Sequence, residues 1–373
     1  MTVRIPLSAP DISETEIAAV ASVLRTPNLC FGPELTAFEQ ELAAFHGVRD
    51  AVALSSGTAG LHLALITLGI GKGDEVILPS FAFNGIANAV VQARATPVLA
   101  EIEATTLNLD PAAVERAITP HTRAILCVHT FGVPAEIDAI RRIAERHGLA
   151  LIEDACEAIG AYYNGQRAGS FGDMAVLGFY PNKQITTGEG GAVLCNDPAR
   201  AARLRRLRNQ GRAPDGGWLD QVERGYNYRL SDIACALGRA QLERIDEILA
   251  VRRKAAERYN ELLDGITGVE RPPLTLERRE ISWFVYVVRL AEGVDRDQVQ
   301  AVLKVHGIAT GRYFAPIHLQ PVWREGLGEA TQRLGLTESI ARRTLALPFF
   351  SSITQEQQQF VVDQLRAAVA ASV

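Results

Sequence analysis

The sequence predicts an α/β fold with a mainly parallel central sheet and a smaller C-terminal α+β domain. Between residues 51 and 197, short apolar runs alternate with helical patterns. Continuous apolar runs are typical of strands that helices cover on both faces, and helical crossovers make such strands parallel. A long helical pattern then leads into a charged loop with two prolines, after which a separate set of elements begins.

The elements of the larger part begin with a helix. Ser13 and Glu16 form a capping box in front of the apolar pattern IAAVASVL. Helical patterns, such as that of residues 135–148, then separate several predicted strands. These strands are expected at residues 51–55, 75–80, 97–102, 124–129, 150–155, 174–179 and 192–195.

One unusually long helical pattern, Ser231 to Leu263, connects the two parts. We expect it to join a large domain of residues 1–240 to a small domain of residues 241–373. The loop of residues 271–282 is the clearest boundary within this region. After it the sequence predicts a strand (283–290), a helix (about 295–306), a short extended piece and two helices, the last opened by a capping box from Thr354 to Gln357.

Composition narrows the class of protein. A net charge of −5 argues against nucleic acid as the main partner. The five cysteines are dispersed with no CxxC pair, so we expect neither disulfides nor a metal site, and a reducing cytoplasm fits best. No apolar run approaches about 18 residues, and the N-terminus has no apolar signal segment. We therefore expect a cytoplasmic protein without a membrane span.

Lys183 lies in an unusual sequence context, GFYPNKQITTGEGG. A strand pattern precedes it, Pro181 stands two residues before it, and a glycine-rich stretch follows. This context places an amine at the end of a strand, where parallel sheets bind ligands. Most lysines in loops are simply solvated. Other residues are needed to decide whether Lys183 is a solvated lysine or part of a ligand site.

Three more features lie at the ends of predicted strands. In LSSGTAGLHLAL, residues 54–65, a strand ends and a helix opens, and helix N-termini bind phosphate through free N–H groups. Asp154 follows a buried strand, where a carboxylate either caps a helix or pairs with a buried cation. Phe81 and Phe83 follow another strand, where an aromatic side chain is more often core than ligand contact.

One cofactor requires all of these features together. Pyridoxal 5′-phosphate needs an amine for its aldehyde, a carboxylate for its pyridine nitrogen, N–H donors for its phosphate and an apolar surface against its ring. A carboxylate about 4 Å from the ring nitrogen, at an effective dielectric near 20, contributes roughly 4 kcal/mol and keeps that nitrogen protonated. Lys183 would hold the cofactor as a Schiff base and later carry a proton.

Motifs spread over nearly the whole chain resemble those of the pyridoxal-phosphate nucleotide-sugar aminotransferases of the DegT/StrS type. The motifs are SSGTAGLHLAL, PSFAF, IEDACEAIGA, GSFGD, FYPNKQITTGEGGA, GYNYRLSDI and GRYFAPIHLQP. Within this family the chain resembles the sugar 4-aminotransferases. The resemblance implies a fold-type I homodimer that transfers an amino group, with glutamate as the donor, to a ketone on a nucleotide-linked deoxysugar. Pyridoxamine 5′-phosphate would form during turnover.

The resemblance also implies roles for single residues. Lys183 would be the Schiff-base lysine, and Asp154 would pair with the pyridine nitrogen. Gly57 and Thr58 would hold the phosphate, and Phe83 would stack on the ring.

Four further residues would act on the neighbouring subunit's site or on the substrate. Asn227 would reach the cofactor phosphate of the neighbouring subunit. Arg229, in the same motif, would bind the sugar diphosphate through two N–H groups. The alternative for this segment is an intrachain cap on the connecting helix. Tyr313 and His318, in GRYFAPIHLQP, would contact the substrate.

Two positions depart from the commonest pattern of the family. Gly178 replaces a phosphate-binding serine, so that contact is lost or is replaced by Asn182 or by water. Glu157 stands where many members carry Gln or His near the cofactor. A glutamate there would disfavour a phenolate on the cofactor ring unless one of the two is protonated or a cation intervenes. The alternative is a helix residue that points away.

Other functions fit less well. Related sugar dehydratases replace the lysine by histidine, and Lys183 argues against that reaction. Cysteine desulfurases need an exposed reactive cysteine on a loop, which is not evident. A non-enzymatic regulator that binds the cofactor would need a DNA-binding module, and the sequence has neither an additional domain nor a basic stripe. For Cys156 and His129, also at strand ends, we expect packing rather than chemistry.

Overall fold

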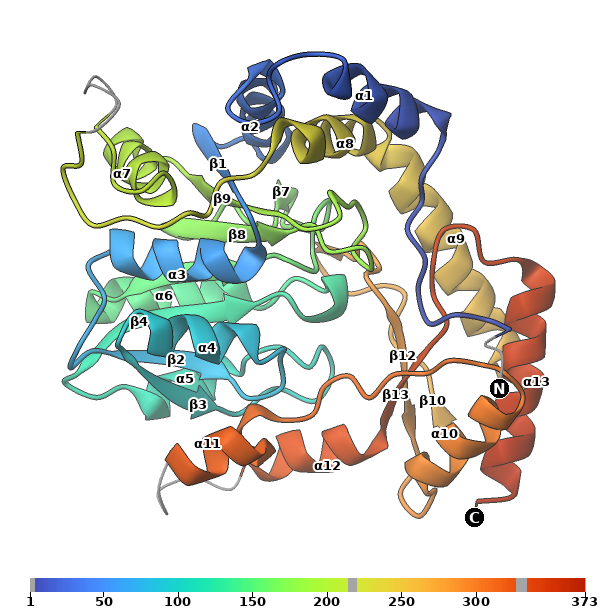
Figure 1. The fold of residues 1–373 in the computed structure, drawn as a ribbon. Helices are drawn as coiled ribbons and strands as arrows, with labels where there is room; N and C mark the ends of the chain where they lie inside the picture. Colours follow the sequence, from blue (N-terminus) through green and yellow to red (C-terminus); the bar gives the residue numbers. More distant parts are fainter. Residues whose placement is uncertain (1–3, 214–219, 327–333, 373) are drawn as a thin grey trace.

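A seven-stranded sheet forms the centre of the larger part of the molecule (Figure 1). The computed structural model describes residues 4–213, 220–326 and 334–372. The strand order is β1-β9-β8-β5-β4-β2-β3. The strands are β1 Asp50–Leu54, β2 Glu75–Pro79, β3 Thr96–Ala100, β4 Thr122–Val128, β5 Ala150–Asp154, β8 Met174–Gly178 and β9 Gly191–Cys195. Each overlaps a predicted strand, so these predictions are confirmed.

The sheet is mainly parallel, as predicted. Strands β3, β2, β4, β5 and β8 pair in parallel in that spatial order. Strand β9 pairs antiparallel with both β8 and β1. The segment between β8 and β9, which contains Lys183, has no helix, so the chain turns back instead of crossing over. Lys183 therefore lies at the same edge of the sheet as the end of β5.

Helices cover both faces of this sheet. Those packed on one face are α3 Gly57–Thr67, α4 Gly85–Gln92 and α7 Pro198–Arg208, and those on the other include α2 Pro33–His46, α5 Pro111–Ala117 and α6 Ile137–His147. The predicted capping boxes are confirmed at α1 Glu14–Leu24 and α13 Gln355–Ala370. Because both faces are covered, only the ends of the strands are left to form a site.

The prediction of a single long helix over residues 231–263 is wrong in one respect. It is two helices, α8 Asp232–Glu243 and α9 Ile245–Leu262, with a break at Arg244 (φ −98°, ψ 10°). The Arg244 guanidinium pairs with Glu16 at 2.8 Å, which ties the break to α1. Helix α8 packs on α1 and α2, whereas α9 crosses to the small domain, so the helical axis has to change direction.

The smaller part is an α+β unit, as predicted. Its sheet has the order β10-β12-β13, and the strand β13 is an element that the sequence pattern did not reveal. Its elements are β10 Val269–Glu270, β12 Tyr286–Leu290, α10 Arg296–Val305, α11 Pro321–Gly326, α12 Gly335–Arg343, β13 Thr344–Leu347 and α13. Short elements complete the fold: β6 Tyr162–Tyr163, β7 Gln166–Arg167, β11 Arg279–Glu280, and the 3₁₀ turns η1 Thr130–Gly132 and η2 Ile317–Leu319.

Two features cross the expected domain boundary at residue 240. Ile5 packs in the core of the small domain and pairs with Ile308. Helix α9 contributes Ile248 to a core of the large domain and Tyr259 to that of the small domain. Helix α9 therefore packs in a core of the large domain near its start and in the core of the small domain near its end. The position of the domain boundary stays a prediction.

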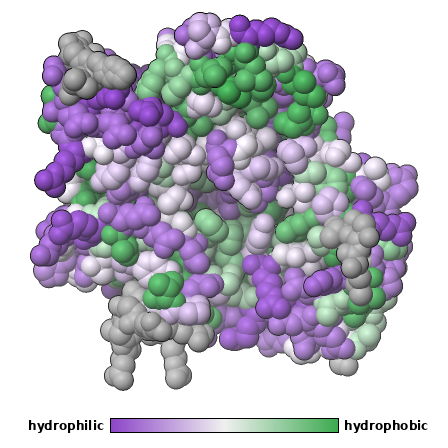
Figure 2. All heavy atoms as spheres, viewed as in Figure 1, coloured by the Kyte–Doolittle hydropathy of each residue, from purple (hydrophilic) through white to green (hydrophobic). Residues whose placement is uncertain are grey.

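Apolar side chains are exposed on one part of the surface. Ile17 and Leu24 of α1, and Leu29 and Phe31 just after it, are each exposed. Figure 2 shows apolar side chains gathered at the top of this face, in the area of α1 and α2 in Figure 1. Among the described helices, none is both long and apolar enough to cross a membrane.

Candidate active site

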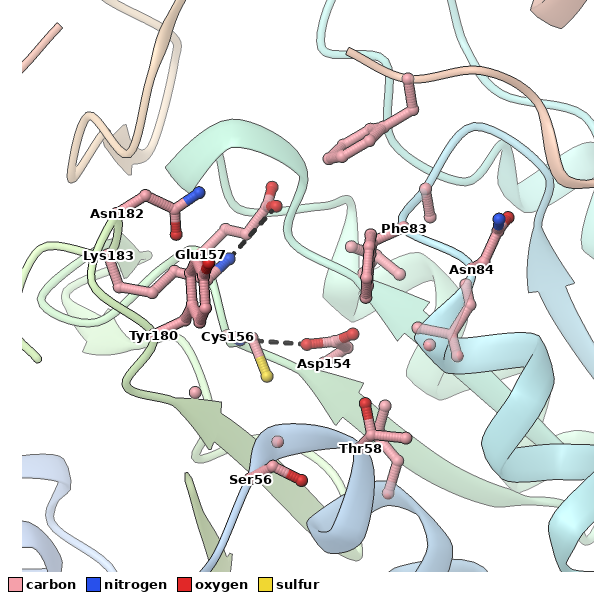
Figure 3. A pocket seen from close by; sticks show the side chains of 18 of the residues that line it. Ser56, Thr58, Phe83, Asn84, Asp154, Cys156, Glu157, Tyr180, Asn182 and Lys183 are labelled. Atoms are coloured by element: carbon pink, nitrogen blue, oxygen red, sulfur yellow. Dashed lines mark hydrogen bonds and ion pairs between the residues drawn. The ribbon is translucent and has the colours of Figure 1, made fainter. Parts of the chain in front are cut away.

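A pocket of about 670 Å³ opens at the carboxyl ends of β5 and β8, beside the N-terminus of α3. This volume lies within the range of small-molecule sites. Figure 3 shows Lys183 and Glu157 on one side, Phe83 and Asn84 on the other, and Asp154 between them. The small domain completes the wall with Phe284, Arg312, Tyr313, Phe314, Ala315 and Gln320.

The amine of Lys183 points into this pocket. Its Nζ lies 3.5 Å from Oε1 of Glu157 and 4.0 Å from the centre of the Phe284 ring. The backbone N–H of Lys183 donates to the carbonyl of Tyr180, which closes the turn after β8. Only 14% of the side chain is exposed, so this is not a solvated loop lysine. The carboxylate and the ring face both attract a cation and fix the position of the amine.

Asp154 ends β5 at the floor of the same pocket. It is buried, and its Oδ1 accepts a hydrogen bond of 3.0 Å from the backbone N–H of Cys156. The bond orients the carboxylate toward the pocket that Lys183 also lines. Asp154 therefore makes the local turn that a capping residue would make, and it also presents a carboxylate to the pocket.

The preceding residue, Glu153, points to the other side of the sheet, because neighbouring residues of a strand face opposite ways. Its buried carboxylate accepts hydrogen bonds from the backbone N–H groups of the GSFGD motif, at Gly169, Phe171 and Gly172, and lies 2.9 Å from His129 Nε2. Burial raises the pKa of Glu153, but the bond to His129 and these N–H donors lower it overall. Glu153 and His129 therefore stabilise the end of β5 on the side of the sheet opposite the pocket.

The N-terminus of α3 forms a third wall. Ser56 is the N-cap, and its hydroxyl accepts a bond of 3.1 Å from Ala59, while Gly57 and Thr58 face the pocket. A Cβ at position 57 would lie 2.8 Å from the Cys156 sulfur, so only glycine lets α3 approach so closely. Free N–H groups at this end favour an anion such as a phosphate.

Cys156 also explains the glycine at position 178. A Cβ on Gly178 would lie 3.1 Å from both Cβ and Sγ of Cys156. The cysteine thus takes up the space that a side chain at position 178 would need. Burial raises the pKa of the Cys156 thiol well above its ordinary value, which keeps it neutral. The expectation that Cys156 packs agrees with this position.

The chemistry of the pocket fits pyridoxal 5′-phosphate. Two buried amide oxygens that line it, Oδ1 of Asn84 and Oδ1 of Asn182, have no hydrogen-bond partner among the described residues. Buried polar atoms are normally paired, so both are suited to a polar ligand. Phe83 is 68% exposed and lines the pocket, so its ring is free to contact a bound cofactor.

The predicted site residues divide into two sets. Those that line the pocket are Gly57, Thr58, Phe83, Asp154, Glu157, Asn182, Lys183 and Tyr313. His318 instead is buried, with its ring 2.6 Å from the Ser80 hydroxyl and 3.4 Å from Glu338. Asn227 is exposed, and Arg229 donates to the side chain of Asn209 at 3.2 Å. None of these three is among the residues that line the pocket.

Several residues that line the pocket were not predicted from the sequence. Phe284 lies within the strand predicted for residues 283–290, and no local signal separates it from core aromatic residues. Arg312 and Lys183 are the cations among the lining residues, but Arg312 also pairs with Asp297 at 3.1 Å. Asn84 could have been noticed as a polar residue just after PSFAF.

The fold and this combination of lysine, aspartate and helix N-terminus define a pyridoxal-phosphate-dependent enzyme of fold type I. The chain belongs to the DegT/DnrJ/EryC1/StrS aminotransferase family, whose sequence profile matches residues 10–366. It is 40% identical to a GDP-perosamine synthase of Caulobacter vibrioides over 371 residues, which cover 98% of this chain and 97% of that protein.

Solved structures agree with this assignment. S. venezuelae DesV in complex with a ketimine intermediate is 38% identical, with a TM-score of 0.90 and 98% of each chain covered. A Streptococcus pneumoniae protein described as a sugar aminotransferase, solved in PMP and PLP forms, is 26% identical. Its PMP form has a TM-score of 0.95 and covers 99% of this chain and 100% of that one. The cofactor predicted from the sequence is therefore confirmed for the family, and the dehydratase and regulator alternatives are not favoured.

Proposed function

We propose that this aminotransferase moves an amino group from glutamate to a keto group of a nucleotide-linked deoxysugar, in amino-sugar biosynthesis in the cytoplasm. The observation that carries the proposal is the common pocket of Lys183, Asp154 and the N-terminus of α3. The similarity to a GDP-perosamine synthase supports a nucleotide sugar as the substrate class.

Each residue of the pocket has a defined task in this proposal. When bound, pyridoxal 5′-phosphate supplies an aldehyde that takes up the amino group and a protonated ring that withdraws electrons. Lys183 would bond to the aldehyde and then move a proton at the substrate carbon. The carboxylate of Asp154 would hold the proton of the ring nitrogen. The N–H groups of α3, with Thr58, would bind the phosphate, and Phe83 would cover the ring.

The first prediction is that the donor half of the reaction runs alone. Glutamate without any sugar should convert the bound cofactor to its pyridoxamine form, because amino transfer takes place in two separate stages. The measurement is the visible absorption of the purified enzyme during titration with glutamate, with glutamine and other amino acids as comparison donors. Keto-sugar nucleotides added afterwards should restore the original spectrum. A spectrum that no amino acid changes would rule out an aminotransferase.

We further propose a homodimer in which each site uses residues of both chains. The exposed apolar side chains of α1 and its following segment suit a second protein surface. Arg229 does not line the pocket of its own chain, and Arg312 is already paired, so a sugar diphosphate would find little free positive charge within one chain. Asn227 and Arg229 of the partner subunit would supply the missing contacts.

Complementation between inactive variants tests the shared site. Lys183→Ala and Arg229→Ala should each be inactive, and re-formed mixed dimers should recover part of the activity, because one of the two hybrid sites then has both residues intact. A mixture of Lys183→Ala with Asp154→Asn is the matched control, since both residues serve the same chain's pocket and every hybrid site keeps one lesion. Proven subunit exchange without recovery in the first mixture would contradict the shared site.

A further inference from the structure

Glu157 is a buried carboxyl group in direct contact with the reactive amine. It lies three residues after Asp154, in the turn that follows β5, and only 7% of the residue is exposed. One oxygen, Oε1, faces Lys183 Nζ at 3.5 Å (Figure 3). The other, Oε2, accepts a bond of 2.9 Å from the backbone N–H of Phe131. The helix residue that points away, the alternative from the sequence, is therefore not what the fold produces.

The backbone that holds Glu157 has an unfavourable conformation. Phe131 has φ 60° and ψ 18°, in the left-handed region that a phenylalanine rarely adopts. Gly132, also at positive φ, would bring a Cβ to 3.1 Å from the carbonyl oxygen of Glu157. Such a conformation is energetically unfavourable and persists where the surrounding structure requires it. The conformation of Phe131 directs its N–H at one carboxyl oxygen of Glu157 and leaves the other oxygen of Glu157 free to face Lys183.

The charge of Glu157 depends on that of Lys183. Burial raises the pKa of Glu157, the charge of Lys183 and the Phe131 N–H lower it, and the charge of Asp154 raises it; overall the pKa is raised. The other titratable groups near it are the Cys156 thiol and the Tyr313 hydroxyl, and burial raises the pKa of both, so they stay neutral. The positive charge of Lys183 therefore stabilises the ionised form of Glu157 at this buried position.

We propose that Glu157 stores the proton of Lys183. An amine can attack an aldehyde, or take a proton from the substrate carbon, only when it is neutral. In the proposed step an N–H bond of the Lys183 ammonium breaks, an O–H bond forms at Oε1 of Glu157, and the nitrogen keeps its electron pair. The reverse step returns the proton. In a buried site this exchange replaces two charges by a neutral pair, which lowers the cost of desolvation.

The proposal rests on the proposed function of Lys183, but it concerns the chain itself and can be tested without turnover. The full-length, cofactor-free protein is titrated while infrared spectra record the carbonyl stretch of protonated carboxyl groups. Subtracting the spectra of Glu157→Gln isolates the band of Glu157, since glutamine has the same shape but cannot bind the proton. In the wild type, this band should disappear at a pH above that of ordinary glutamates.

Variants of the lysine separate charge from shape. Lys183→Met removes the cation and keeps the length of the side chain, so the Glu157 band should persist to higher pH than in the wild type. Lys183→Arg keeps a cation, and its midpoint should stay near that of the wild type. Lys304→Met, at an exposed position on α10, is the control for mutation of a distant lysine and should leave the band unchanged.

Two results would overturn the proposal. The first is no Glu157 band at any pH, and the second is a midpoint in Lys183→Met that equals the wild-type value. Either result leaves the proposed function intact if the cofactor still bonds to Lys183. Attachment of the cofactor to another lysine would instead refute the proposed function, whatever the infrared titration shows.

Discussion

Replacing Lys183 by alanine is expected to abolish turnover and to leave any bound cofactor without a covalent bond to the protein. Alanine removes the amine that would hold the cofactor and the base that would move the proton at the substrate carbon. Positioned proton transfer alone contributes about 10² to 10⁴ in rate, so the loss should exceed about 10⁴-fold once the covalent attachment is lost as well. Steady-state assays with glutamate and a keto-sugar nucleotide, with the visible spectrum of the purified protein, measure both effects.

The chain offers a clean control for this variant. It has four lysines, Lys72, Lys183, Lys254 and Lys304, and among them only Lys183 lines the pocket. Lys72→Ala changes an exposed lysine and should retain wild-type activity and colour. If Lys183→Ala kept a tenth of the wild-type turnover, the amine at this position would not be the reactive group.

Replacing Asp154 by asparagine should lower turnover by about 10³-fold and leave the fold unchanged. Asparagine can still accept the bond from the Cys156 N–H, so the local turn is kept. It cannot hold a proton on the ring nitrogen of the cofactor, because an amide carries no charge. The lost interaction of about 4 kcal/mol at an effective dielectric near 20 corresponds to roughly three orders of magnitude in rate.

A second aspartate separates capping from chemistry. Asp110 caps α5 by accepting from the N–H groups of Ala112 and Ala113, and it does not line the pocket. Asp110→Asn should therefore have near wild-type turnover, with at most a small loss of stability. If Asp154→Asn were also within tenfold of the wild type in kcat, Asp154 would be a cap and no more.

The fold could be predicted largely because its central strands are buried on both faces. Such strands appear in the sequence as continuous apolar runs, and each predicted run overlaps an observed strand. No sequence signal marked the break between α8 and α9, because position 244 is an arginine and not a glycine or a proline. It arises because α8 packs on α1 and α2 while α9 reaches the small domain, a requirement of tertiary structure that no local pattern records.

Some features of the candidate site could likewise be predicted from the sequence, and others could not. Lys183 and Asp154 could be predicted because each stands at the end of an apolar run in an unusual context. The contact of Phe284 with Lys183 could not, because it joins residues about a hundred positions apart through the packing of two domains. For the same reason the sequence could not show that Ser80 and Glu338 surround His318.

Chemical trapping of the cofactor tests whether Lys183 is the amine that binds it. Borohydride reduces the C=N bond between a lysine and the cofactor to a stable amine, and peptide mapping then identifies the modified residue among the four lysines. We expect one modification per chain, on the peptide that contains Lys183, and none in Lys183→Ala. A modification on Lys72, Lys254 or Lys304, or no modification in protein that contains the cofactor, would contradict this expectation.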